Sequence, residues 1–98
     1  MKLLTKAIEK KLETADMDAT DPPIIVHLFN PSGAGDWYVI DGEKTDDGDW
    51  KFFGLVDLHE KELGYFTLSE LAAIKCPPFG LGIERDMYFG EKRLSEVH

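Results

Sequence analysis

Three short apolar segments separated by turn signals constrain the fold more than any other feature of the chain. Residues 24–29, 36–41 and 50–57 are rich in β-branched and aromatic side chains, which pack well on a pleated surface. The first segment closes in Asn30-Pro31-Ser32-Gly33, and the connection between the other two contains an Asp-Gly step, a strong hairpin signal. Strands joined by such short connections run antiparallel, so the sequence predicts a meander.

A helix is predicted ahead of these strands and another after them. Thr5 can cap a helix over residues 6–14, whose apolar stripe recurs every four positions. A fourth short strand is expected at residues 63–66, and Thr67-Leu68-Ser69-Glu70 has the spacing of a capping box for a helix over 68–75. The predicted fold class is therefore α+β, an antiparallel meander sheet of about four strands with an N-terminal helix and a second short helix after the sheet.

The last part of the chain and the faces of the sheet have more than one interpretation. Residues 88–97 are expected to add an edge strand or a docked tail. The strands are apolar on both faces, as Trp37-Tyr38-Val39-Ile40 illustrates, which is typical of a sheet covered on both sides or of one side left for a partner. A homodimer through the aromatic face is one such arrangement.

Size and composition favour one folded domain over residues 1–98. The chain has 98 residues with 43% hydrophobic and 11% aromatic content, too much for a disordered tail despite a net charge of −8. No apolar run approaches the roughly 20 residues that span a bilayer, and the charges that follow Leu3-Leu4 do not fit a signal peptide. The single cysteine, Cys76, fits a reducing compartment and is interpreted as a small buried residue at a helix end. We expect a cytoplasmic protein with no membrane contact.

The negative charge is concentrated in two segments. Residues 13–21 hold four acids and no base, and residues 36–49 hold six acids against Lys44 alone, so their net charges are −4 and −5 while the rest is close to neutral. The two segments could meet in a negative face that attracts a protein with a basic surface, or they could be solvated loops. Direct nucleic-acid binding is disfavoured because the bases are scattered. The candidate partner-binding residues are Asp16, Asp18, Asp21, Asp41, Glu43, Asp46, Asp47 and Asp49.

A second candidate site surrounds the triplet Glu84-Arg85-Asp86. An arginine between two acids could clamp an anion or tune a carboxylate for acid–base work, although alternation on a strand would put Arg85 on the opposite face, and an internal ion pair is the simpler interpretation. With Asp57 and His59 these residues define the alternative, a small enzyme or ligand-binding module. The histidine and carboxylate spacings match no metal-ligand pattern, so neither a metal nor a cofactor is predicted, and His27 is interpreted as a satisfied core or edge residue.

Three motifs carry a family resemblance. They are PFGLGIERD at residues 78–86, GYFTLSEL at 64–71 and MKLLTK at 1–6. With them the chain resembles the family catalogued as domain of unknown function 2958. The resemblance implies a cytoplasmic protein of bacterial plasmids, phages and integrative elements and implies no activity. The expected function is that of a small, acidic, non-catalytic protein that binds a macromolecular partner, for example a defence or nucleic-acid-processing protein.

Overall fold

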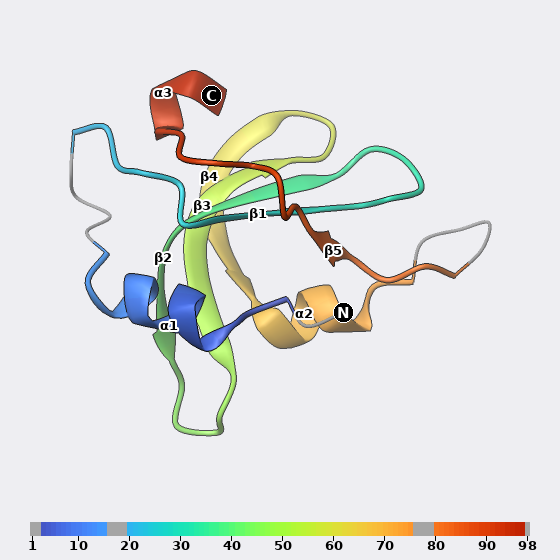
Figure 1. Ribbon diagram of the computed structural model, residues 1–98. Helices are drawn as coiled ribbons and strands as arrows, with labels where there is room; N and C mark the ends of the chain where they lie inside the picture. Colours follow the sequence, from blue (N-terminus) through green and yellow to red (C-terminus); the bar gives the residue numbers. More distant parts are fainter. Residues whose placement is uncertain (1–2, 16–19, 76–79, 98) are drawn as a thin grey trace.

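The computed structural model describes residues 3–15, 20–75 and 80–97, and these form a five-stranded antiparallel sheet with short helices (Figure 1). The strand order is β4-β3-β2-β1-β5, in which the first four strands form the predicted meander. The fold class predicted from the sequence is confirmed. In chain order the elements are α1 (Lys6–Glu13), β1 (Val26–Phe29), β2 (Asp36–Lys44), β3 (Trp50–Asp57), β4 (Lys61–Thr67), α2 (Leu68–Ala73), β5 (Glu84–Arg85) and α3 (Leu94–Val97).

Both predicted helix caps are present. The Thr5 hydroxyl accepts a hydrogen bond from the Ile8 amide at 3.2 Å, which satisfies an N–H group that has no partner inside the helix. The Thr67 hydroxyl accepts from the Glu70 amide at 3.2 Å, which caps α2, and donates to the Glu70 carboxylate at 2.9 Å. The helices α1 and α2 therefore begin where the sequence indicates, and α2 ends two residues before the predicted limit.

The register of the central strands depends on one glycine and one bulge. Gly54 of β3 lies opposite Val39 of β2, where a Cβ atom would stand 2.1 Å from the Tyr38 carbonyl oxygen. Only glycine permits the two strands to approach so closely. A bulge between Val39 and Asp41 shifts the register, and pairing then continues to Lys44, three residues beyond the predicted end of β2.

The main core lies between one face of the sheet and the two helices, of which α1 contacts β2 while α2 contacts β3 and β4. Alternate residues of β1, β2 and β3 point to this side, and the N-terminal segment adds two leucines ahead of α1. The buried cluster comprises Leu3, Leu4, Leu12, Val26, Leu28, Trp37, Val39, Trp50, Phe52, Phe66, Leu71 and Ile83.

The segment after β5 runs along the outer side of β1 and ends in α3. The Ile24 amide donates to the Lys92 carbonyl oxygen at 2.8 Å, and Pro23 forms an isolated bridge with Arg93. At the far end the Lys61 ammonium donates to the Val97 carbonyl oxygen at 3.0 Å. Residues 88–97 thus form the docked tail that was one of the two expectations, while the edge strand, β5, forms earlier.

The apolar residues of the motif at residues 78–86 differ in burial. Ile83 is buried in the core, Leu81 is exposed, and the pairing with β1 covers Glu84 and Arg85. Phe79 lies outside the described residues, as does Cys76, which the sequence indicated as a small buried residue at a helix end.

Candidate functional site

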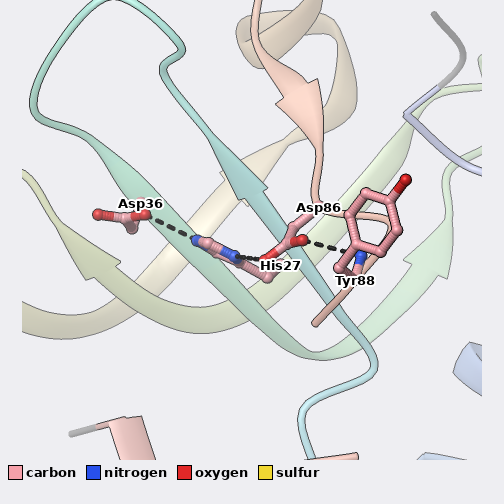
Figure 2. Close-up of polar contacts among 4 residues, drawn as sticks. All are labelled: His27, Asp36, Asp86 and Tyr88. Carbon is pink, nitrogen blue, oxygen red and sulfur yellow. Dashed lines mark hydrogen bonds and ion pairs between the residues drawn. The ribbon is translucent and has the colours of Figure 1, made fainter. Parts of the chain in front are cut away.

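His27 of β1 is held between two carboxylates that come from distant parts of the chain (Figure 2). Its Nε2 lies 2.7 Å from Asp36 Oδ1, and its Nδ1 lies 3.0 Å from Asp86 Oδ2. An ionised carboxylate can only accept hydrogen bonds, whereas a neutral imidazole carries a single N–H. Each ring nitrogen has a carboxylate at hydrogen-bond distance, so an imidazolium could donate to both of them and a neutral ring to one.

Aromatic rings enclose this imidazole. Tyr38 stacks on it at a centroid distance of 4.5 Å and an angle of 6°, and Phe89 approaches to 5.2 Å. Only 12% of the His27 side chain is exposed. The ring therefore ties β1, β2 and the segment after β5 together, in agreement with the interpretation of His27 as a satisfied residue.

The environment of His27 shifts the pKa values of two neighbouring groups, Asp86 and Tyr38. The hydrogen bond from His27 is the main reason that the pKa of Asp86 lies below its usual value, and the Tyr88 amide adds to the effect. The pKa of Tyr38 is raised, first by burial and then by the negative charges of Asp36, Asp57 and Asp86. Three carboxylates thus act on one phenol at this end of the sheet.

The second oxygen of Asp86 fixes a turn. Asp86 Oδ1 accepts from the Tyr88 amide at 3.0 Å, and Figure 2 shows the Tyr88 ring directed away from the imidazole. Tyr88 is 94% exposed. His27 and Asp86 together position a surface turn whose side chains point to solvent.

The structure brings together part of the alternative site cluster. Asp57 lies opposite Asp36 in the β2–β3 ladder, Glu84 lies opposite Phe29, and Asp86 binds His27, so these three share one face of the sheet. Arg85 pairs with Leu28, a core residue, and so belongs to the other face, as alternation predicted. His59 is exposed in the turn between β3 and β4.

These polar groups do not assemble into a metal site. In the parts of the chain that the structure describes, no group of three or more His, Cys, Asp or Glu residues could hold a metal ion. Both nitrogens of His27 are already engaged, so this ring offers no free base. Asp36 and Tyr38 were not predicted as neighbours of His27. The sequence holds only a weak signal for the pair: Asp36 begins one strand, and His27 is the one histidine of the apolar strand before it.

Two of the candidate partner-binding acids hold elements together. Asp21 accepts from the Ser95 amide at 2.9 Å and from its hydroxyl at 2.8 Å, which anchors α3 and lowers the pKa of Asp21. Asp49 accepts from the Ser69 hydroxyl at 2.6 Å and from the Trp50 amide at 2.8 Å, which ties the β2–β3 hairpin to α2 and lowers the pKa of Asp49.

The remaining candidates lie on the hairpin or outside the described residues. Asp46 is exposed, and Asp47 accepts a hydrogen bond from the Thr45 hydroxyl within the turn, which lowers the pKa of Asp47. Asp41 accepts from the Gly42 amide at 2.8 Å, and Glu43 is exposed. Asp16 and Asp18 are outside the described residues.

A hollow of about 620 Å³ lies between α1 and the β2–β3 hairpin. Four carboxylates and two lysines surround it, and its apolar side chains come from α1 and from the sheet. The acids are Glu9, Glu13, Asp41 and Glu43, the bases are Lys44 and Lys51, and the apolar side chains include Leu12, Trp50, Phe53 and Tyr65. The two acidic segments thus meet in part, through Glu13 of the first and two acids of the second. Sequence reasoning did not single out Glu9 or Glu13 as contact residues, because only the packing of α1 brings them to the hairpin.

Comparison with known proteins gives one match. A family model described as "Protein of unknown function (DUF2958)" matches residues 1–97. Neither the curated proteins nor the solved structures include one that matches the chain. Within the described ranges, no helix is long and apolar enough to cross a membrane.

Proposed function

This chain belongs to the family described as Protein of unknown function (DUF2958), and we propose that it is a small, non-catalytic, cytoplasmic protein that binds a partner with a basic surface. One observation carries the proposal: four carboxylates, against two lysines, surround a partly apolar hollow between α1 and the β2–β3 hairpin. A negative rim attracts cations and orients them, and an apolar lining gives the bound group surface to bury.

The lining of the hollow fits the side chain of a lysine or an arginine. Such side chains bury their aliphatic stem while the charged end remains beside water or carboxylates. Tyr65 already accepts a cation on its ring, because the Lys51 ammonium lies 4.8 Å from the ring centroid. An arginine of the partner could bind Glu13 and Glu43 and stack on the same ring.

A protein fits this surface better than a nucleic acid does. The net charge of −8 repels phosphates, and the two lysines at the hollow are outnumbered by four carboxylates. The family resemblance suggests a mobile-element setting, in which the partner would be a defence or nucleic-acid-processing protein whose own nucleic-acid-binding surface is basic.

The test compares two pairs of substitutions that change the net charge equally. Immobilised wild-type protein, Glu13→Gln/Glu43→Gln and Glu60→Gln/Glu91→Gln are exposed to a bacterial lysate and eluted with a salt gradient. All four acids are exposed, so both double variants should keep the fold. We expect the wild type and Glu60→Gln/Glu91→Gln to retain a partner protein that salt elutes. Glu13→Gln/Glu43→Gln should not retain it. Equal retention by both pairs would contradict a role for the hollow.

The alternative function is a small enzyme or ligand-binding module at Asp57, His59, Glu84, Arg85 and Asp86. The observation that favours it is the presence of three of these acids on the face that carries His27 and Tyr38. A ligand would have to compete with the bonds that already occupy His27. We therefore place partner binding first.

A further inference from the structure

The outer edge of β4 has the properties of a strand that pairs with another chain. β4 is one end of the sheet, and within the described residues its backbone bonds only to β3. The other end of the sheet is different, because β5 has only two residues there. An edge strand leaves a row of N–H and C=O groups that can pair with a further strand.

β4 has few of the devices by which edge strands avoid such pairing, and these are confined to its first two residues. It has seven residues, no proline and an uninterrupted register with β3. Its charged residues, Lys61 and Glu62, are the first two residues of the strand. In the middle, Leu63 and Tyr65 share one face and are 47% and 60% exposed. Between them, Gly64 leaves open space where a side chain would stand.

Charge favours this edge as the place where two copies of the chain could meet. Each copy carries a net charge of −8, so most surfaces of two copies repel one another. β4 carries one base and one acid and is neutral as a whole. The sequence of β4 also complements itself: in an antiparallel pair centred on Gly64, each Leu63 lies opposite the Tyr65 of the other copy.

We infer that two copies of this protein associate through β4. The two strands pair antiparallel about a two-fold axis at Gly64 and join the two five-stranded sheets into one. Aromatic and aliphatic residues directly opposite each other stabilise such a pair, and here the same contact occurs twice because the interface is symmetric. This inference goes beyond the proposed function and does not depend on it; the two share Tyr65, which also lines the hollow, whereas Leu63 does not.

The experiment is sedimentation equilibrium of the full chain over a range of protein and salt concentrations. We expect a monomer–dimer equilibrium that shifts toward dimer as salt rises, because salt screens the repulsion between the two acidic chains. Leu63→Glu and Tyr65→Glu each place a carboxylate opposite an apolar side chain, so each should raise the dimer dissociation constant at least about tenfold. The matched control is Tyr88→Glu, an equal charge change at an exposed site away from β4, which should leave the constant within about twofold of the wild type.

A cross-link tests the register. In a Cys76→Ser background, Gly64→Cys should form a disulfide-linked dimer under mild oxidation, because residues at the two-fold axis face each other within disulfide range. Far-ultraviolet circular dichroism checks that each variant is folded.

A wild type that remains monomeric at all concentrations would overturn the inference, as would a dimer that neither glutamate variant weakens. Salt should strengthen the dimer and weaken the capture of a basic partner by the hollow, so the two proposals can fail separately.

Discussion

Removing the Asp86 carboxylate should destabilise the protein by about 2 kcal/mol. The substitution Asp86→Ala removes the charged bond to His27 at 3.0 Å and the bond from the Tyr88 amide, also at 3.0 Å. A hydrogen bond between charged groups contributes about 1.5–3 kcal/mol, and the 28% exposure of the Asp86 side chain favours the lower part of that range. The Tyr88 bond is exposed and adds less. For a domain of this size, 2 kcal/mol lowers the melting temperature by about 10 °C.

The pH dependence of this difference identifies its origin. Because the pKa of Asp86 is lower in the folded protein than in the unfolded chain, its contribution is fully present above the unfolded carboxyl value of about 3.9. It is lost as the pH falls through the folded pKa. The gap in melting temperature between wild type and Asp86→Ala should therefore close as the pH falls through the acid range.

Thermal unfolding followed by circular dichroism measures both effects. Asp86→Asn, which keeps an acceptor oxygen but not the charge, should lose about half as much stability. In a His27→Gln background, Asp86→Ala should cost much less than in the wild type, because the two residues share one interaction. An unchanged melting temperature for Asp86→Ala, or a gap that persists in acid, would refute the assignment of a charged His27–Asp86 bond.

Two further predictions concern the glycines of β3 and β4 and the phenol of Tyr38. Gly54→Ala should destabilise the protein by about 3 kcal/mol in urea titrations, since its Cβ would stand 2.1 Å from the Tyr38 carbonyl oxygen, whereas Gly64→Ala, with open space, should cost less than about 1 kcal/mol. Tyr38→Phe should remove a late step from the ultraviolet titration of the three tyrosines, because burial and three carboxylates raise the pKa of Tyr38. A titration unchanged by Tyr38→Phe would contradict that shift.

The elements with local signals could be predicted from the sequence. β3 has its predicted bounds, and α1 and α2 begin at their predicted caps, because a cap and a hydrophobic repeat act over a few residues. The extension of β2 to Lys44 was missed, since the bulge that permits it has no clear sequence signal.

The candidate sites were less predictable because they depend on contacts between distant residues. Asp86 lies 59 positions from His27, and a two-residue strand such as β5 has no periodicity to detect. Asp21 and Ser95, 74 positions apart, meet only when the segment after β5 docks. The charge count located the acidic segments correctly, but only the packing of Leu12 of α1 beside the hairpin brings Glu9 and Glu13 to the same hollow.

The attachment of β5 to β1 has a consequence for the order of folding. β2, β3 and β4 are joined by short turns and need little loop closure, whereas the pairing of β1 with β5 closes a loop of more than fifty residues. The hairpins should therefore form before the transition state and the β1–β5 contact after it. Substitutions at Asp86 would then accelerate unfolding and leave the refolding rate nearly unchanged, so the His27–Asp86 bond governs the lifetime of the native state and not the speed at which it is reached.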